Sequence, residues 1–517
     1  MSWIVIGQEK ELVKLVSKSG ENNGLLPKGS FLTVEPKNTD AKFILRVESS
    51  LQHDPYSPSP LVIDMDIQSL YPESKSQNIV YAYRIKDISN RTDGLIDFIP
   101  AQSLARRSNQ EEIDIAFGNT DKTGPKVFPA TIHAGKNQLL VDDNGNYVNV
   151  DLPEEFFFYQ TQICGKTGSG KTVGSKYLAQ YFVEEMGGAV LAINVKDVDF
   201  LQMNRPSNIK NERINEEWDL LGYKARGVEN CTIYYPATSN IHDIQGIDYS
   251  ICEKVTMSVK SIRPEALSGL LQNISDLGAQ SFPDIFRYWK EYEMSDTNTF
   301  SDFVRYFSEH RETLRLNTLN VNGDESEVPL HRGTFDNIIR NINDAVKFFD
   351  NDEARSLTHE DILSTGKMSV INVTGEEGTV FGSILLRQLL RDIVRAKSDQ
   401  LSDVPILVII DEVHMFYNSD ASKKALGELD TICRTGRSQK IGVIFSSQND
   451  ADIPKGLSSV INSKFYFKSD GLKSGNFGIS TQEISTLEKG YAVANIHDLP
   501  QLKVLKFPLS LAGVVEN

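Results

Sequence analysis

One short segment constrains the fold of this chain more than any other. It has the form GxxxxGK(S/T), and its residues are Gly165, Lys166, Thr167, Gly168, Ser169, Gly170, Lys171 and Thr172. Glycines let consecutive backbone N–H groups point at one phosphate, and a helix that follows adds the positive end of its dipole. The apolar run Phe156 to Ile163 predicts a buried strand before the segment, and apolar residues from Val173 onward recur at helical spacing. The sequence therefore predicts a strand, a phosphate-binding loop and a helix, with the loop and Val173 around a nucleotide.

Two acidic residues end a second apolar run, Pro405 to Ile410. We expect Asp411 to hold Mg²⁺ together with the Thr172 hydroxyl, while Lys171 contacts the β- and γ-phosphates. Glu412 follows directly and is placed to polarise the attacking water. Paired with a complete phosphate-binding loop, these acids predict hydrolysis of ATP with Mg²⁺, rather than binding alone.

Composition bounds the remaining possibilities. A length of 517 residues predicts two to three domains. No stretch has the pattern of a spanning helix or a signal peptide, so we expect a cytoplasmic protein with no membrane partner. The cysteines lack a CxxC pair and neighbouring histidines, which favours reduced, buried thiols. The net charge of −16 argues against a surface coated for nucleic acid, but it leaves room for a basic channel inside a ring.

The pattern along the chain predicts an α/β protein in three parts. Residues 1–150 alternate between short strands and turns, which predicts an N-terminal β-barrel. Residues 151–245 and 365–517 predict the nucleotide-binding core, and residues 246–364 a helical insertion.

Several elements are expected within these parts. Paired strands are predicted at 29–34 and 41–47, a hairpin around 142–146, and the second strand of the core at 189–195. Residues 317–327 are predicted to form an exposed loop. The polar residues Lys196, Asp197 and Asp199 face the nucleotide or the pore, or belong to a solvated loop, which is favoured. Two apolar stripes predict core-facing helices, and they comprise Leu267, Leu270, Leu271 and Ile274, and Phe335, Ile338, Ile339, Ile342, Val346 and Phe349.

Downstream of the acids, three further motifs occur in order. They are Arg434-Thr435-Gly436-Arg437, the strand-like run Ile441 to Gln448, and Asp452 to Leu457 with an Ile-Pro-Lys-Gly turn. This order, with Asp411 to His414 before it and a barrel ahead of the core, resembles the HerA branch of the HerA/FtsK motor ATPases. The resemblance implies a RecA-like P-loop core, a HAS-barrel-like N-terminal domain and a helical insertion.

The first two of these motifs add two candidate catalytic residues. Gln448, at the end of its strand, is able to hydrogen-bond both the water and the γ-phosphate. Arg437 carries a permanent charge that would offset the charge developing on the transferred phosphoryl group. Arg437 would act in its own site or across a subunit boundary, or it is a surface arginine in a turn. His414 also fits a DExH helicase motif, but no second RecA-like half is evident, and a packing or hydrogen-bonding role is favoured.

The resemblance also implies a function. It predicts a homohexameric ring that uses ATP to translocate double-stranded DNA together with a nuclease or another effector protein. The alternative is an ATPase scaffold or regulator of an antiviral effector complex, with little processive movement along DNA. The acidic net charge favours this alternative.

Overall fold

The structure is a computed structural model, and the chain forms two compact units. The first unit comprises Met1–Glu154 and Phe465–Pro508, and the second comprises Glu155–Lys464 and Leu509–Asn517. The structure describes residues 2–17, 26–37, 40–53, 77–88, 98–118, 123–133, 135–196, 198–270, 276–417, 427–453, 456–469 and 479–515. Within these ranges, no helix combines the length and the apolar character that crossing a membrane requires. All four cysteines are free thiols; Cys164, Cys231 and Cys433 are buried as predicted, whereas Cys252 is partly exposed.

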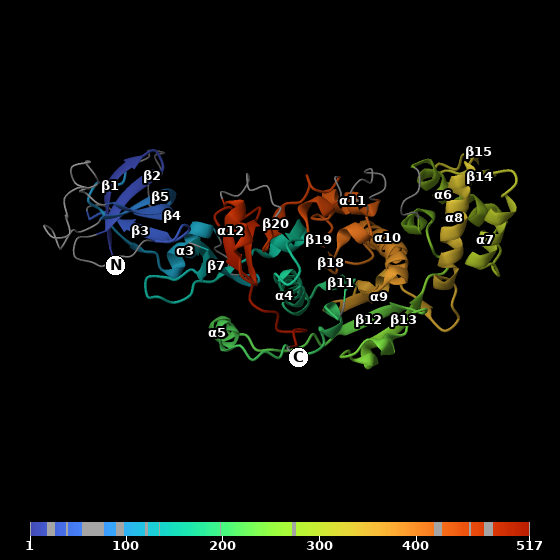
Figure 1. The fold of residues 1–517 in the computed structure, drawn as a ribbon, viewed down its shortest axis with the longest axis horizontal. Helices are drawn as coiled ribbons and strands as arrows, with labels where there is room; N and C mark the ends of the chain where they lie inside the picture. The colour runs from blue at the N-terminus through green and yellow to red at the C-terminus, as the bar shows by residue number, and fades with distance from the viewer. Residues whose placement is uncertain are drawn as a thin grey trace, which may run out of the picture. The chain divides into compact units, whose positions relative to one another are not determined.

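A closed barrel of strands begins the first unit, which confirms the predicted N-terminal barrel (Figure 1, blue). Its strands follow the order β1-β2-β5-β4-β3-β6. They are β1 Trp3–Glu9, β2 Leu12–Ser17, β3 Phe31–Glu35, β4 Lys42–His53, β5 Gln77–Ile88 and β6 Leu104–Arg107. β3 and β4 are antiparallel, with Val34 opposite Phe43, as predicted for these two segments. Trp3, Leu15 and Leu45 are fully buried inside the barrel, so alternate side chains fill its core.

The rest of the first unit joins segments from both ends of the chain. Its second sheet has the order β20-β21-β22-β7-β8, and β9 also pairs with β7. The elements are α3 Gln110–Phe117, β7 Lys126–His133, β8 Lys136–Leu139, β9 Val150–Asp151, β20 Ser463–Tyr466, α12 Thr481–Ser485, β21 Tyr491–Asn495 and β22 Val504–Lys506. The predicted hairpin around 142–146 is short, with an antiparallel bridge between Val141 and Tyr147 and a hydrogen bond from the Val148 N–H to the Leu140 carbonyl oxygen at 3.0 Å. The longer pairings on either side of it, those of β8 and β9, are made with β7.

A parallel sheet forms the centre of the second unit. Its order is β16-β13-β12-β17-β11-β18-β19-β10, and the recorded pairs along it are parallel. The strands are β10 Gln160–Cys164, β11 Ala189–Asn194, β12 Cys231–Pro236, β13 Cys252–Thr256, β16 Arg355–Ser356, β17 Met368–Asn372, β18 Ile406–Ile410 and β19 Ile441–Ser447. Parallel strands bring their carboxyl ends to one edge of the sheet, where α/β proteins hold their ligands.

Helices pack on the parallel sheet, and α4 lies where the sequence predicted a helix after the phosphate loop. The helices on the sheet include α4 Lys171–Glu184, α10 Glu376–Ser398 and α11 Glu428–Thr435, and the same unit contains α5 Glu212–Leu221. α4 packs on β11 and β18, and its buried face includes Tyr177, Leu178 and Phe182. The carboxyl-terminal segment returns to this unit, where Gly513 accepts a hydrogen bond from the buried Lys176 ammonium at 2.8 Å. Burial lowers the pKa of Lys176 to about 8.

The segment 246–364 is mixed rather than purely helical. It holds β13, β16, the 3₁₀ helix η5 Pro264–Leu270, α6 Asp276–Tyr288, α7 Phe300–Glu309, β14 Arg315–Leu319, β15 Glu325–Pro329, α8 Arg332–Ala345 and α9 His359–Ile362. The loop predicted at 317–327 is wrong, because β14 and β15 form an antiparallel hairpin there. Leu271 and Ile274 lie outside the described residues.

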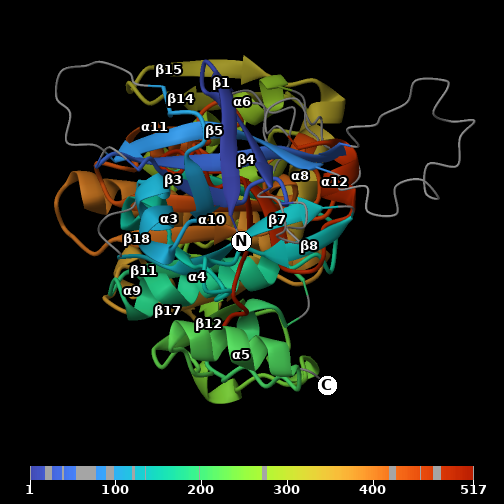
Figure 2. The same ribbon diagram turned by 90° about the vertical axis from the view of Figure 1, so that its left-hand side faces the viewer.

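Aromatic packing holds the helices of this segment together. Figure 1 shows α6, α7 and α8 grouped beside the β14–β15 hairpin, and Figure 2 shows the hairpin strands again near α6. The Phe286 and Phe303 rings meet edge to face at 4.8 Å, and the Phe307 and Phe335 rings stack at 4.7 Å. Phe335 belongs to the apolar stripe that the sequence identified. The residues of this stripe on α8 pack in the hydrophobic core.

The strand ahead of the phosphate loop starts later than the apolar run predicts. Glu154–Phe158 is a 3₁₀ turn, and β10 begins only at Gln160. Phe157 packs on Phe182 of α4, with ring centroids 5.1 Å apart, and its carbonyl oxygen touches Gly442 of β19. The aromatic residues therefore anchor the helix against the sheet, whereas the strand itself buries polar side chains.

We predict that Gly442→Ala destabilises the second unit. A Cβ atom there would lie 1.6 Å from the Phe157 carbonyl oxygen, so the strand must shift, at a cost of ~3 kcal/mol in unfolding free energy. Gly333→Ala in α8 is the matched control, since its Cβ would meet nothing within 4 Å and alanine favours a helix. Urea denaturation followed by circular dichroism measures both. Equal stabilities for the two variants would contradict the predicted close approach.

Candidate functional site

Three neighbouring strands bring the predicted site residues to one edge of the parallel sheet. β19 lies between β10 and β18, with Ser447 opposite Cys164 and Phe445 opposite Ile410. The phosphate loop follows β10, the acidic pair follows β18, and Gln448 follows β19. The register thus places all three groups side by side, although they are far apart in the sequence.

The phosphate loop has the backbone that its glycines permit. Gly168 and Gly170 have φ angles of 78° and 107°, in the left-handed region that other residues rarely adopt. Gly170 is the N-cap of α4, so the free N–H groups of the first helical turn face the loop. Thr172 and Val173 stand in this first turn, next to the loop residues Gly165 to Ser169.

Lys171 is held at the centre of the loop. Its ammonium donates hydrogen bonds to the carbonyl oxygens of Gly165 at 2.6 Å and of Lys166 at 3.2 Å. The pKa of Lys171 is lowered because burial outweighs the opposing effect of the Asp411 and Glu412 charges. The loop, the lysine and the two acids are therefore one electrostatic unit.

Glu412 is buried and fixed in an unusual backbone conformation. It has φ 47° and ψ 54°, which is uncommon for a residue with a side chain and is found at functional sites. Its Oε1 atom forms an ion pair with Lys196 and accepts a hydrogen bond from Gln448 Nε2 at 2.9 Å. Burial alone would raise the pKa of Glu412, but the bonds from Lys196 and Gln448 outweigh it and lower the pKa.

Lys196 is the site residue that the sequence misjudged. It stands in the loop after β11 and was expected to be solvated, but its ammonium pairs with the Glu412 carboxylate. The sequence did contain a signal for this pairing. Lys196 follows the carboxyl end of β11, and β11 is the neighbour of β18, which carries the acidic pair. Asp197, in the same loop, lies outside the described residues.

The segment after Glu412 is anchored from α10. The guanidinium of Arg387 lies 4.4 Å from the centre of the Tyr417 ring and donates a hydrogen bond to the Phe416 carbonyl oxygen at 3.2 Å. Tyr417 and Phe416 are buried, so this contact fixes the turn that carries the acids. His414 is exposed, with Nδ1 at 3.6 Å from Glu412 Oε2, so the structure places it beside the carboxylate.

The residues at this edge fit ATP with Mg²⁺. Ser169 Oγ and Glu412 Oε2 are buried and have no hydrogen-bond partner among the described residues, so both are available to a ligand. Burial, together with the Glu412 charge, raises the pKa of Asp411, so a cation beside it would stabilise its anionic form. The described residues contain no cluster of three or more potential metal ligands. One carboxylate plus the nucleotide phosphates suits Mg²⁺, which usually keeps several waters.

Arg437 does not lie at this edge. It is exposed in the turn ahead of β19, where its guanidinium is 4.9 Å from the centre of the Tyr159 ring. Tyr159 precedes β10, whereas the phosphate loop follows it, and the five residues of β10 span about 16 Å. The structure therefore brings together Lys171, Asp411, Glu412 and Gln448, but not Arg437. Pro454 and Lys455 of the last motif lie outside the described residues.

The fold and this constellation define the site of a P-loop ATPase. A phosphate loop, a metal-binding acid, a second acid for water and a polar residue on the strand between them are the parts that nucleotide hydrolysis needs. No protein-family model matches the sequence.

Two curated relatives identify a more specific resemblance. The chain is 25% identical over 174 residues to the DNA double-strand break repair helicase HerA of Sulfurisphaera tokodaii, which covers 30% of this chain and 35% of that protein. It is 23% identical over 172 residues to HerA of Sulfolobus acidocaldarius, with the same coverage. The match spans about a third of either relative, and it confirms the resemblance to HerA over that part of the chain.

Solved structures also share features with the chain at low identity. VirB4 of Thermoanaerobacter pseudethanolicus has a TM-score of 0.45 and 13% identity, over 75% of this chain and 97% of that one. The bacterial conjugative coupling protein TrwB has a TM-score of 0.47 and 12% identity, over 79% of this chain and 93% of that one.

We predict that Lys196→Met shifts the pH dependence of ATP hydrolysis. Glu412 polarises water only when it is deprotonated, and the Lys196 pair lowers its pKa. Without the lysine, burial raises that pKa, so activity will be lost at a higher pH as the solution is acidified. Steady-state kcat measured across the acid range checks this. Lys260→Met, at an exposed lysine of the same unit, should leave the profile unchanged, and an identical shift in both variants would contradict the role of Lys196.

Proposed function

We propose that the protein is an ATP-driven translocase of double-stranded DNA. The observation that carries the proposal is the convergence of Lys171, Glu412 and Gln448 at one sheet edge, with a 2.9 Å hydrogen bond between the last two. Lys171 binds the β- and γ-phosphates, and Thr172 and Asp411 hold Mg²⁺, which neutralises charge on the phosphates. Double-stranded DNA as the substrate rests on the similarity to HerA, named as a DNA double-strand break repair helicase.

The Glu412 network provides a mechanism for turnover. Gln448 donates a hydrogen bond to Glu412 in this structure. It follows β19, which pairs with β10, the strand that leads into the phosphate loop, so it is able to respond to the γ-phosphate. A glutamine that moves toward the phosphate would release one bond on the carboxylate. Glu412, then held by Lys196 alone, accepts the proton of the attacking water. Nucleotide binding and base activation are in this way coupled through one hydrogen bond.

The proposal includes a hexameric ring of identical subunits, and the position of Arg437 supports it. Arg437 is exposed, and its guanidinium lies on Tyr159, at the end of β10 opposite the phosphate loop of its own chain. A neighbouring subunit would allow the same arginine to reach a γ-phosphate, where its charge stabilises the transition state. The ring would carry the RecA-like cores and the inserted segments 246–364, and the N-terminal barrels would dock a nuclease or another effector.

A second candidate function is favoured by the net charge of −16. An acidic surface repels DNA phosphates unless the positive charge is gathered in a channel. The same ATPase would then serve as a scaffold or regulator of an antiviral effector complex. Dependence of turnover on DNA separates the two functions.

We predict opposite behaviour for two site variants in a DNA experiment. Glu412→Gln should keep ATP, stop turnover and bind duplex DNA in an ATP-dependent, salt-sensitive manner, because Glu412 acts chiefly when water attacks. Lys171→Ala should lose nucleotide binding and with it the ATP-dependent DNA binding. Fluorescence anisotropy on a labelled duplex, with ATPase assays of the wild type with and without DNA, measures this.

Two outcomes would overturn parts of the proposal. Turnover by Glu412→Gln at the wild-type rate would remove the assignment of the base. A wild-type ATPase rate that duplex DNA does not change, with no DNA binding by Glu412→Gln, would favour the scaffold function.

We predict that Arg437→Ala keeps nucleotide affinity but lowers kcat by about 10³-fold or more, as the loss of a transition-state charge does. Mixing it with Lys171→Ala should restore part of the activity, because an intact phosphate loop then meets a neighbour's arginine. Arg434→Ala is the matched control, since Arg434 is exposed and paired with Asp430 at 3.0 Å. ATPase assays across mixing ratios measure this, and no recovery at any ratio would exclude action between subunits.

A further inference from the structure

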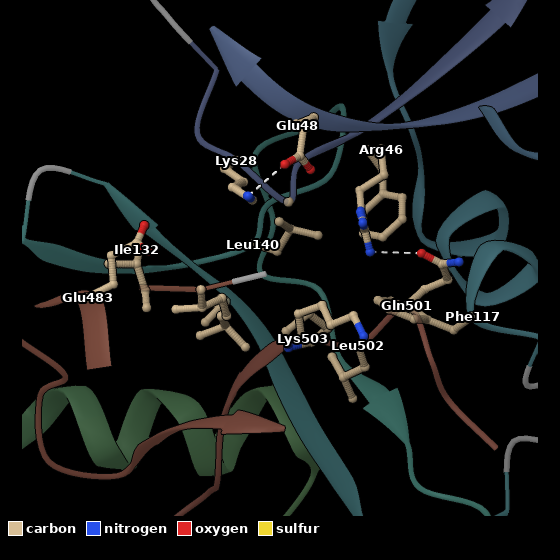
Figure 3. Close-up of a pocket in the computed structure, with 16 residues that line it drawn as sticks. Lys28, Arg46, Glu48, Phe117, Ile132, Leu140, Glu483, Gln501, Leu502 and Lys503 are labelled. Atoms are coloured by element: carbon tan, nitrogen blue, oxygen red, sulfur yellow. Dashed lines mark hydrogen bonds and ion pairs between the residues drawn. The ribbon is translucent and has the colours of Figure 1, made fainter. Parts of the chain in front are cut away.

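The first unit contains a cavity that the proposed ATPase mechanism does not use. Its volume is about 360 Å³, within the range of sites for small ligands. Figure 3 shows that its walls come from the barrel, the end of α3, β7 and the segments before α12 and β22. These segments belong to one compact unit, although they are far apart in the sequence, from Lys28 to Val504.

One part of the wall is apolar. The side chains here are buried and belong to five different segments, so they meet only in the folded unit. They are Phe31, Phe117, Ile132, Leu140, Leu502 and Val504. Removing apolar ligand surface from water at this wall would stabilise a complex through the hydrophobic effect.

The charges on the wall are not balanced. Lys28 pairs with Glu48 at 2.7 Å, and Glu483 accepts hydrogen bonds from Ser480 as part of the N-terminal cap of α12. Arg46 donates to the neutral Gln501 side chain at 2.8 Å. Among the described residues, neither Arg46 nor Lys503 has a carboxylate at salt-bridge distance. The three cations and two carboxylates that line the cavity leave one net positive charge, at the end of the wall that Arg46 and Lys503 form.

The two cations also affect each other. Burial lowers the pKa of Lys503, and the positive charge of Arg46 lowers it further. An anion between them would relieve this repulsion and would form charge-assisted hydrogen bonds with both side chains. The apolar wall alongside would contact the uncharged part of the same ligand (Figure 3).

We propose that this cavity binds a small amphipathic anion. Its carboxylate or phosphate monoester lies between Arg46 and Lys503, and its apolar body lies against Phe31, Phe117 and Leu140. Nothing in the nucleotide site takes part, so the proposal is independent of the ATPase function.

Calorimetric titration of the full chain tests the site with three probes. Decanoate and decyl phosphate carry the two candidate head groups, and decanol carries neither. We expect saturable binding of one or both anions, with at least tenfold weaker binding of decanol. Lys503→Met should weaken anion binding tenfold or more and leave decanol unchanged, and Arg46→Met should act in the same direction.

Matched variants keep the test decisive. Lys506→Met, on β22 but outside the cavity, and Lys171→Ala, in the phosphate loop, should both bind the anions like the wild type. Ala130→Leu should weaken all probes, because Ala130 lines the cavity and the larger side chain fills it. Absence of saturable binding, equal affinity for decanol and the anions, or unchanged affinity in both Lys503→Met and Arg46→Met would overturn the proposal.

Discussion

The insertion of β19 between β10 and β18 is the constraint on which the rest of the candidate site depends. Parallel pairing on both sides of β19 sets the register of the three strands and therefore where their carboxyl ends lie relative to one another. Gly442 lets β19 approach the Phe157 carbonyl oxygen. A shift of one residue in either register would turn the side chains of that strand to the other face of the sheet. The distance between Gln448 and Glu412 is therefore fixed by backbone hydrogen bonds several residues away.

Burial of charge at this edge requires compensation, and the site provides it internally. Lys171, Asp411 and Glu412 are each less than a tenth exposed, and isolated buried charges of this kind are costly. The positive charges of Lys171 and Lys196 offset the negative charges of the two acids. The two carboxyl groups are affected differently, because the pKa of Asp411 is raised while that of Glu412 is lowered. Such a split keeps the carboxylate next to Lys196 ionised, as a base for water must be.

The first unit shows how sequence-distant segments create chemistry of their own. The barrel contributes Arg46 and the segment before β22 contributes Lys503, and only the sheet that joins β22 to β7 places them on one cavity. Neither residue belongs to a motif. Their proximity is instead a consequence of how the last part of the chain packs into the unit that the first part begins.

The sequence by itself determined the elements whose residues carry local rules. The phosphate loop, α4, β11, β18 and the barrel follow from glycine placement and from apolar periodicity, which depend only on neighbours along the chain. Tertiary structure alone decided the rest. The polar strand β10, the β14–β15 hairpin, the pairing of Lys196 with Glu412 and the distance of Arg437 from its own phosphate loop all depend on which strands lie side by side. Strand order is a non-local property, because the hydrogen bonds that set it join residues far apart in the chain.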